Sequence, residues 1–595
     1  MGYLPELNEI VTSRQMTEAF YGYDHQERTA KGSWWDEMNL TTDLFPVLSQ
    51  RKPRGVVTTL TSPQGLLAKD ALAWVDGASL YYNGYAVAGI TLSTAAEDCP
   101  KQLVSMGAYI IVFPDGVYVN TKDLTEHGSI NAAFSTATDA DVTYTPCRAD
   151  GSDLEGTRTV SPTEPEDPEN GDYWVDTSGS IHVLKQYSAT SSMWIQVPTP
   201  YLRIGYTGIG TAFADYDGVT ISGAAYSGES EAMEAQFAEI NGDHLIYARS
   251  ENAIVIAAIL DEAYTQQAGS VGIRREAPKM DFVVEAQNRL WGCFYGMHQG
   301  KMLNEIYACA LGDFKNWRKY MGISTDSYTV SLGTDGEWTG AITYQNSPLF
   351  FKEDSMTKIF GSQPSSYQTN TSQLRGVQKG SGRSLQIVNE TVIYKGTTDI
   401  CAFDGSMPVS ISQRLGKGRY SAAVAGSVGG KYYVSMLDGH GERQTFVFDL
   451  SREIWHRETA INALCFAEMD DELYAIDADT GSLVAMLGSE GTAEAAPAWY
   501  AETGVLGYEM PDHKYVSRFN IRMNLGAGAA CKLYMQYDSS GTWEERASMT
   551  GQGNLRTFTL PVIPRRCDHL KIRFEGTGPA KIFSIARILE QGGDG

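Results

Sequence analysis

The sequence predicts an almost entirely β-sheet protein whose main part is a β-propeller. Short runs of alternating apolar and polar residues recur along most of the chain, and glycine-rich turn signals separate them. Groups of these runs begin roughly 40 to 60 residues apart, which is the spacing of four-stranded propeller blades. The 60 glycines and the 11% of aromatic residues suit short strands joined by tight turns.

The first group of runs lies at 71–87, where Asp76-Gly77 and Asn83-Gly84 are strong hairpin signals. The second lies at 105–123, with a turn predicted at Pro114-Asp115-Gly116. Later groups occupy 280–298, 339–361, 385–408, 420–450 and 461–487. We therefore expect about six to eight blades. A series of unrelated antiparallel hairpins, as in stacked sandwiches, is the alternative. The propeller is favoured because each unit is too short to bury a core alone.

The domain boundaries follow from breaks in this pattern. Residues 1–60 are polar and irregular, which indicates an N-terminal arm or partial blade. Helices are expected only near 17–23 and 229–239. We predict the first part of the propeller at 61–138, an inserted small β module at 139–200, the remainder of the propeller at 201–490, and a C-terminal β-sandwich at 497–595. The insertion begins with a linker-like Pro/Glu/Asp run, and the last region contains longer alternating strands.

The net charge of −25 argues against a basic nucleic-acid-binding surface. An acidic wall would repel phosphate, so passive passage of DNA stays compatible with this charge. The eight cysteines are scattered without a C-x-x-C pair, which favours reduced thiols over zinc sites or a disulfide framework. The opening MGYLPELNEI predicts no signal peptide. No run approaches the roughly 18 apolar residues that a membrane helix needs.

The motifs of common enzymes are absent from the sequence. None of the nine histidines has metal-ligand spacing, and neither a G-x-S-x-G elbow nor a phosphate-binding P-loop occurs. We therefore expect no catalytic residue, no cofactor and no metal site, and predict that the protein is not an enzyme. Carboxylates of a propeller glycosidase could still converge in space without a sequence trace, so this less favoured reading stays open.

Two tryptophans of the predicted insertion, Trp174 and Trp194, are candidates for contact with a glycan or a protein partner. Exposed indole rings stack against sugars. The alternative is that both rings form the core of the small module, and the sequence leaves both readings open.

Several phrases of the sequence resemble one family of virion proteins. Residues 285–292, EAQNRLWG, are followed by NEIYACALGDFKNW at 304–317. Together with 39–55, 104–107, 112–116, 350–355 and 394–405, they are similar to the tail nozzle proteins of short-tailed bacteriophages, also called tail tubular or head–tail stabilisation proteins. Residues 564–569 and 588–591 resemble the closing domain of related prophage proteins, which leaves open a long-tailed phage, where such a protein would lie elsewhere in the tail. The resemblance covers most of 39–590 but includes no invariant motif, and the insertion at 139–200 departs from it.

The resemblance implies a propeller-bearing virion structural protein in a homo-oligomeric ring, typically a hexamer, below the portal and adaptor. Double-stranded DNA would pass through this ring during ejection without sequence-specific binding. The implied partners are the adaptor, the portal and the tail fibres. The implied location is the virion tail, after assembly in the host bacterial cytoplasm. A receptor- or glycan-binding tail protein is the alternative, with a propeller glycosidase as the less favoured third reading.

Overall fold

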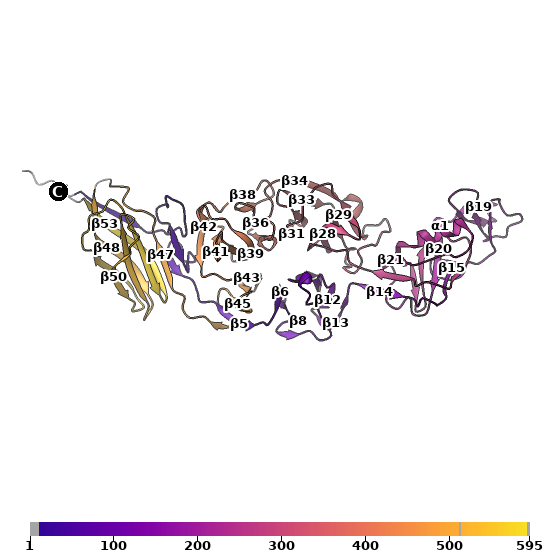
Figure 1. Ribbon diagram of the computed structural model, residues 1–595, viewed down its shortest axis with the longest axis horizontal. Helices are drawn as coiled ribbons and strands as arrows, with labels where there is room; N and C mark the ends of the chain where they lie inside the picture. Colours follow the sequence, from indigo (N-terminus) through magenta and orange to yellow (C-terminus); the bar gives the residue numbers. More distant parts are fainter. Residues whose placement is uncertain (1–10, 511–512, 592–595) are drawn as a thin grey trace, which may run out of the picture.

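The computed structural model describes residues 11–510 and 513–591. The chain is elongated, and three bodies follow one another along its long axis (Figure 1). A two-sheet body contains the C-terminal region, a ring of sheets occupies the middle, and an inserted body lies at the opposite end. The predicted all-β character is confirmed, because the described residues contain many four-stranded antiparallel sheets and only one α-helix, α1 (Glu231–Ile240).

Seven sheets make up the middle body, called here the sheet ring. The first three contain β6 (Pro63–Lys69), β7 (Ala71–Asp76), β8 (Ser79–Tyr82) and β9 (Tyr85–Ala86); β10 (Gln102–Met106), β11 (Tyr109–Phe113), β12 (Val117–Asn120) and β13 (Asp123–Ser129); and β27 (Phe282–Ala286), β28 (Arg289–His298), β29 (Lys301–Ala308) and β30 (Tyr328–Ser331).

The next three sheets contain β31 (Gly340–Tyr344), β32 (Ser347–Phe351), β33 (Ser355–Phe360) and β34 (Gln368–Gln373); β35 (Gln386–Val388), β36 (Thr391–Lys395), β37 (Ile400–Phe403) and β38 (Val409–Ser410); and β39 (Ser421–Val428), β40 (Lys431–Leu437), β41 (Arg443–Asp449) and β42 (Ile454–Glu458). The seventh contains β43 (Ala463–Met469), β44 (Glu472–Asp477), β45 (Ser482–Ala485), β5 (Gly55–Thr59) and β46 (Thr492–Ala493). Short 3₁₀ turns occur at Ala96–Asp98, Pro364–Ser366, Gly382–Ser384 and Gln413–Leu415.

Hydrophobic packing closes these sheets into a propeller-like ring. A separate core cluster lies between each sheet and the next, and one of these clusters joins the seventh sheet to the first. In that last cluster Leu66 and Trp74 of the first sheet pack with Tyr474 and Ile476 of the seventh. The ring therefore has no free end. Its closing sheet also takes β5 from the N-terminal segment, paired with β45, so segments far apart in sequence complete one sheet.

The glycine-containing dipeptides that the sequence analysis read as hairpin signals lie in turns between strands, as expected. Asn83 and Gly84 both have positive φ, at 51° and 82°, and join β8 to β9 with Tyr82 opposite Tyr85. Gly77 (φ 57°) likewise lies in the turn between β7 and β8. Two residues of positive φ suit the right-handed twist of adjacent strands, which is why such dipeptides indicate hairpins.

The inserted body spans more of the chain than the predicted 139–200. It begins with β14 (Ala132–Ser135), which pairs with β26 (Gly272–Arg275), so residues 201–275 lie outside the ring where the sequence analysis placed them in the propeller. The sequence analysis missed this boundary because apolar and polar residues alternate along the strands of the insertion as they do along those of the ring. Its first two sheets contain β14, β26, β21 (Gly218–Ser222) and β22 (Gly242–Leu245); and β23 (Ala248–Ser250), β24 (Ala253–Ala257), β20 (Tyr201–Gly205), β15 (Val142–Cys147) and β25 (Tyr264–Gln266).

The outermost part of the insertion is a third sheet, called here the tip sheet. It contains β16 (Arg158–Ser161), β17 (Tyr173–Asp176), β18 (Val183–Ser188) and β19 (Met193–Gln196). This sheet falls within the expected 139–200. α1 packs in the main core of the insertion through Met233 and Phe237, in the region where a short helix was expected.

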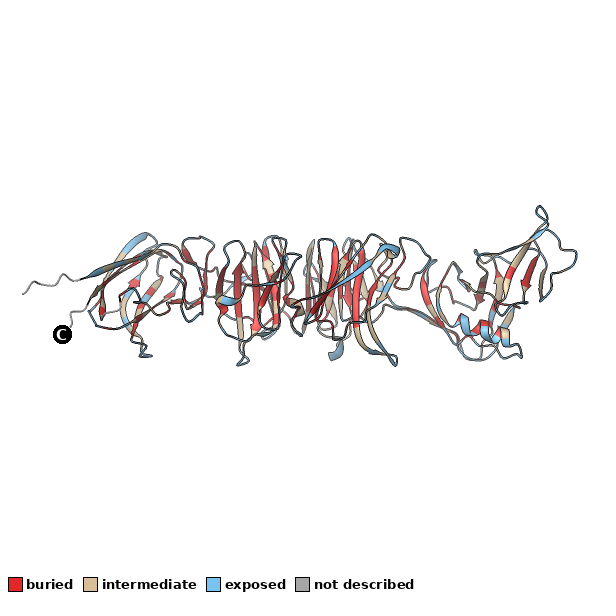
Figure 2. Ribbon diagram, turned by 90° about the horizontal axis from the view of Figure 1, so that it is seen from above, coloured by how far each residue is buried: buried red, intermediate tan, exposed pale blue. Residues whose placement is uncertain are grey.

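The two-sheet body joins both ends of the chain. One sheet contains β1 (Thr12–Thr17), β3 (Leu40–Thr41), β4 (Leu48–Gln50), β53 (Ala580–Gln591), β48 (Lys514–Leu525) and β51 (Leu555–Pro561). The other contains β2 (Asp36–Met38), β47 (Trp499–Glu502), β52 (Leu570–Thr577), β49 (Ala530–Tyr537) and β50 (Glu544–Thr550). Side chains from both sheets share one core, and buried residues follow the strands of all three bodies (Figure 2).

Most of the segment 1–60 thus belongs with the C-terminal region, and only β5 joins a blade-like sheet. The helix expected at 17–23 is absent: the segment leaves β1 at Thr17, buries Phe20 in the core of the two-sheet body, and turns at Gly22, whose positive φ no α-helix contains. The Tyr23 amide donates a hydrogen bond to the Trp455 carbonyl at 2.7 Å. At Gly22, with φ 66°, an added Cβ would collide with the same carbonyl, so a side chain at this position is excluded.

Candidate functional site

A cavity of about 790 Å³ opens where the innermost strands of the ring begin. The charged residues on its wall are Asp281, Glu337, Lys379, Arg383 and Arg443. The aromatic residues Phe282, Tyr295 and Trp338 also line it. A neighbouring cavity of about 870 Å³ shares Asp281 and Arg383 with the first and extends along the innermost strands.

Most cations of this region are bonded to the ring itself. Arg383 donates to the backbone carbonyl of Leu464 at 2.8 Å and to that of Lys101 at 3.3 Å, so one guanidinium joins three different sheets or turns. Burial lowers the pKa of Arg383 from its ordinary value. Arg443 donates to the Ala422 carbonyl at 2.9 Å. These contacts stabilise the inner wall of the ring.

Two carboxylates face this cavity. Asp281 accepts a hydrogen bond from the Tyr295 amide at 3.0 Å, and burial, together with the negative charge of Glu337, raises the pKa of Asp281. Glu337 forms an ion pair with Lys379. Sequence reasoning did not single out either residue, because they come from turns before different sheets and no spacing connects them. A pair of carboxylates is the minimum that a glycosidase requires.

The tip sheet places both predicted tryptophans on the same sheet face. Trp174 is buried, and its Nε1 donates to the Ser161 carbonyl at 2.9 Å. Trp194 is half-buried, and its ring meets that of Trp174 edge to face with centroids 5.7 Å apart. Tyr187 lies beside Trp194, at a centroid distance of 5.3 Å. The Nζ of Lys185 lies 4.4 Å from the centroid of the Trp174 ring.

This aromatic cluster differs from an ordinary core in one respect. The core of the tip sheet lies on its other face, where Tyr173, Val175 and Leu184 pack together. The indole Nε1 of Trp194 has no hydrogen-bond partner among the described residues. This Nε1 is buried, so what Trp194 offers is a partly accessible ring, at the end of the molecule farthest from the two-sheet body (Figure 1).

A third cavity, of about 550 Å³, lies in the two-sheet body between the N-terminal segment and the C-terminal strands. Its apolar wall includes Phe20, Trp34 and Phe574, and Arg587 at its rim is paired with Glu509 at 2.9 Å. The sequence carries no signal for this cavity, because its two walls lie more than 450 positions apart in the chain.

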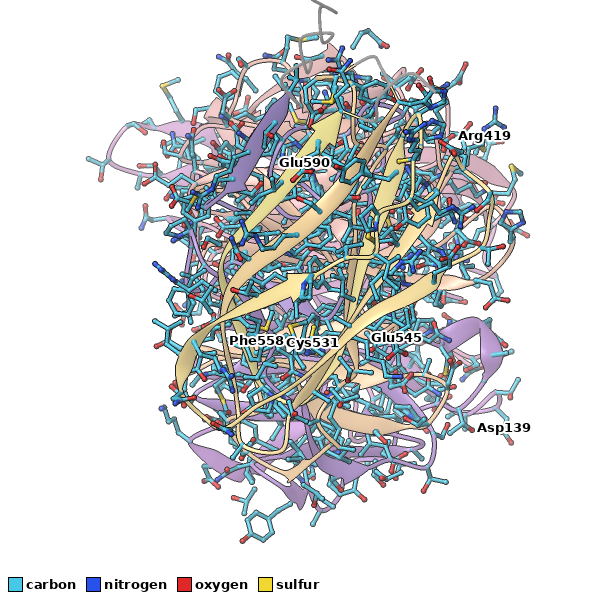
Figure 3. All side chains as sticks on the ribbon, turned by 90° about the vertical axis from the view of Figure 1, so that its left-hand side faces the viewer. Asp139, Arg419, Cys531, Glu545, Phe558 and Glu590 are labelled. Carbon is cyan, nitrogen blue, oxygen red and sulfur yellow. The ribbon has the colours of Figure 1, made fainter. Side chains whose placement is uncertain are left out.

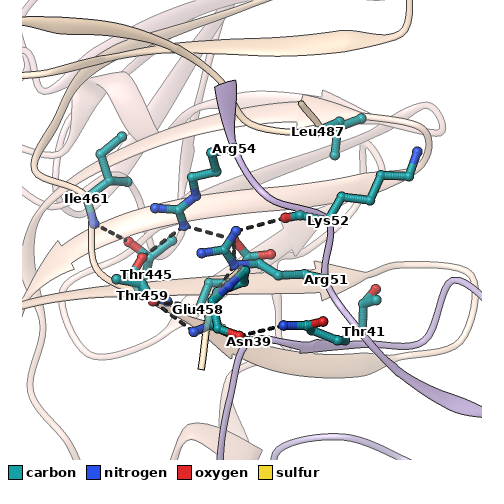
Figure 4. A network of polar contacts seen from close by, with 12 residues as sticks. Asn39, Thr41, Arg51, Lys52, Arg54, Thr445, Glu458, Thr459, Ile461 and Leu487 are labelled. Atoms are coloured by element: carbon teal, nitrogen blue, oxygen red, sulfur yellow. Dashed lines mark hydrogen bonds and ion pairs between the residues drawn. The ribbon is translucent and has the colours of Figure 1, made fainter. Parts of the chain in front are cut away.

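The joint between the two-sheet body and the ring contains a buried polar network (Figure 4). Glu458, at the end of β42, lies 2.9 Å from Arg54 and 3.7 Å from Arg51. Arg51 also pairs with Glu494 at 2.6 Å and donates to the Asn39 side-chain oxygen at 2.9 Å. Arg51, Arg54 and Glu458 are all less than a tenth exposed. The turn-rich segment 50–55 is thus anchored by charge pairs that fix its course.

No group of three His, Cys, Asp or Glu side chains within 11–510 and 513–591 is arranged to hold a metal ion. All eight cysteines are unpaired thiols. No helix of the described chain has the length and apolar character needed to cross a membrane.

Comparisons with known proteins give distant structural likenesses alone. No protein-family model matches the chain, and no curated protein matches it. Among solved structures, the WD40 domain of SCAP from fission yeast is 9% identical, with a TM-score of 0.20 and coverage of 94% of this chain and 99% of that one. A sialidase of Trypanosoma rangeli is 7% identical, with a TM-score of 0.20 and 96% coverage of both chains. Scores this low support no conclusion, and the architecture above is based on strand pairing and packing.

Proposed function

We propose that the protein is a structural subunit of a bacteriophage tail, of the nozzle type, in which the sheet ring is a seven-bladed β-propeller and the two-sheet body a β-sandwich. The observation that carries this proposal is the end-to-end arrangement of three β bodies with a buried, charge-paired joint between two of them. Elongated subunits with fixed joints can stand side by side around a channel and keep its shape. The sequence resemblance at 285–317 supports the same assignment.

The charge of the chain suits a DNA conduit. Six copies of a chain with a net charge of −25 would carry about −150, six times −25, in one assembly. A wall of this sign repels the DNA backbone, so DNA can slide without sequence-specific binding. The same repulsion acts between subunits, and we expect assembly to improve with added salt because salt screens charges over about 10 Å at 0.1 M.

Mass photometry and negative-stain imaging of the purified chain, alone and mixed with tail proteins from the same gene neighbourhood, test this proposal. Rings, or a stable stoichiometric complex with an adaptor or portal protein, are the expected result. A monomer that joins none of these proteins over a range of salt concentrations would contradict the tail-nozzle assignment.

The second candidate function is binding of a glycan or receptor by the tip sheet, and the half-buried Trp194 favours it. A glycan array with intact protein is the first measurement. Trp194→Ala should abolish any binding found there, whereas Ile181→Ala, a change at an 80% exposed residue of the same body, should preserve it. Trp174 is unsuitable as a first test because it is buried. Turnover of a sugar panel that Asp281→Asn abolishes would instead support the glycosidase reading.

A further inference from the structure

The larger sheet of the two-sheet body has, on each side, an edge strand whose outer side pairs with no described strand. β53 pairs with β48 along one side and with β4 and β1 along the other. Beyond β48 lies β51, which pairs with no other described strand, and β1 pairs only with β53. β1 and β51 therefore lie on opposite edges of one sheet. Figure 3 views this body end-on and labels Glu590 on β53 and Phe558 on β51.

The free edges of this sheet carry fewer charged side chains than another free edge of the body. β50, at the edge of the second sheet, carries Glu544, Glu545 and Arg546, and all three form ion pairs. Charged side chains on an edge strand oppose pairing with another chain. By contrast, Arg556 is the single charged residue of β51, and Arg14 is the single charged residue of β1.

Both edges also expose apolar side chains. Met16 of β1 is 39% exposed, and Val11, just before this strand, is 55% exposed. On the other edge, Leu555 of β51 and Ile563 just beyond it are 52% and 77% exposed. Phe558 of β51 points toward the core but is only partly buried, because the sheet ends at its strand. A further strand alongside β51 would cover it.

We propose that copies of the chain join head to tail, with β51 of one copy pairing with β1 of the next to continue the sheet. The inference rests on the proposed ring and names the surface that builds it. The strands are of similar length, six residues in β1 and seven in β51. β1 and β48 both run antiparallel to β53, and β51 runs antiparallel to β48. β51 and β1 therefore run in opposite directions, so neighbouring copies in the same orientation can form an antiparallel pair.

The use of opposite edges determines the kind of assembly. An interface between two different surfaces of identical chains is heterologous, and it gives a closed ring when the rotation between neighbours closes. A two-fold dimer would instead join the same edge of two copies. The occupant of each edge is thus the complementary edge of a second copy, and it supplies both the backbone partners and the apolar cover that the edge lacks.

Cysteine cross-linking tests this pairing. The side chains of Arg14 and Thr557 are exposed on the same, outer face of the sheet, away from the core residues of their strands. A double variant, Arg14→Cys with Thr557→Cys, treated with a short bismaleimide should give a ladder of species at multiples of the chain mass. An equimolar mixture of the two single variants should give cross-linked dimers alone, because each chain then has one reactive edge. The unmodified chain, with its native thiols, gives the background.

A second set of variants separates this inference from the proposed function. Thr557→Lys combined with Met16→Lys places like charges on the two edges and should convert rings to monomers. Ser548→Lys, an equivalent exposed position on β50, should leave the rings intact. Rings that persist in the double lysine variant, together with the absence of a ladder from the double cysteine variant, would overturn the edge pairing while leaving the nozzle proposal standing. Cross-links from these edges to another tail protein would also overturn it. A wild-type chain that forms neither a ring nor a complex with another tail protein refutes the nozzle proposal itself.

Discussion

Glu458→Ala removes the carboxylate on which the joint between the ring and the two-sheet body depends. The side chain lies at the end of β42 and is 7% exposed. It faces Arg54 at 2.9 Å and Arg51 at 3.7 Å, both of them on the segment that crosses from one body to the other. Its loss leaves guanidinium groups buried without this partner.

The magnitude follows from what each arginine retains. Removing one partner of a buried ion pair costs about 3 to 5 kcal/mol, since an uncompensated charge remains in a poorly solvated site. Arg51 keeps Glu494 at 2.6 Å, while Arg54 keeps only the Thr459 carbonyl at 2.9 Å. We therefore expect a loss near the lower limit, about 3 kcal/mol, in the free energy of unfolding of the ring. For a domain of this size that loss lowers the Tm by about 4 to 6 °C.

Differential scanning calorimetry is the appropriate assay, because the bodies of a multidomain chain can unfold in separate transitions. The matched control is Glu27→Ala. Glu27 pairs with Lys417 at 3.0 Å, but the two side chains are 90% and 93% exposed. Exposed pairs of this kind contribute little to stability, so the control should unfold like the unmodified chain. A Glu458→Ala variant that cannot be distinguished from this control would refute the assignment of the joint to buried charge pairing.

Two further changes test the interiors of the ring and of the two-sheet body. Burial lowers the pKa of Lys395 on β36 to about 8, so this amine loses its proton at a lower pH in the folded chain than in the unfolded chain. The folded state then binds fewer protons than the unfolded state between about pH 8 and 10.4, and stability rises with pH across this window. Relative to Lys395→Met, the unmodified chain should gain on the order of 1 to 3 kcal/mol from pH 7 to pH 10.5 in chemical denaturation, and a pH-independent difference would contradict this. Gly576→Ala should destabilise the two-sheet body by about 1 to 3 kcal/mol, because the new Cβ would overlap the ring of the buried Trp499. Gly439→Ala has open space around it and serves as the control, and equal melting temperatures for the two variants would disprove the steric argument.

Local features of the fold could be read from sequence because they are determined by neighbouring residues. The alternation of apolar and polar side chains predicts strands through their two-residue period, and Asn83-Gly84 predicts a tight hairpin through its tolerance of positive φ. The expected helix at 229–239 is present as Glu231–Ile240, where Ser230 caps the first turn by accepting from the Met233 amide. Each of these predictions needs information from a few residues only.

The course of the N-terminal segment could not be read in the same way. β5 completes a sheet with β45, more than 400 positions later, and β2 pairs with β47 at a similar separation. Nothing in the composition of 1–60 indicates which of many edge strands it joins, because backbone pairing is available to any extended segment. The insertion was underestimated for the same reason, since the pairing of β14 with β26 is invisible until both strands are placed.

The candidate sites likewise combine features that the sequence predicts with features that only the structure shows. Sequence alone singled out Trp174 and Trp194, because two tryptophans in a short module are conspicuous. Their different exposure is a property of the tip sheet, which buries one ring beneath the other. The sequence by itself determined an acidic, all-β chain of repeated strands with tight turns, since these depend on composition and local period. Only the tertiary structure decided that the ring closes, that both terminal regions build one body, and that the larger sheet of this body has β1 and β51 at opposite edges, because each depends on which distant strands meet.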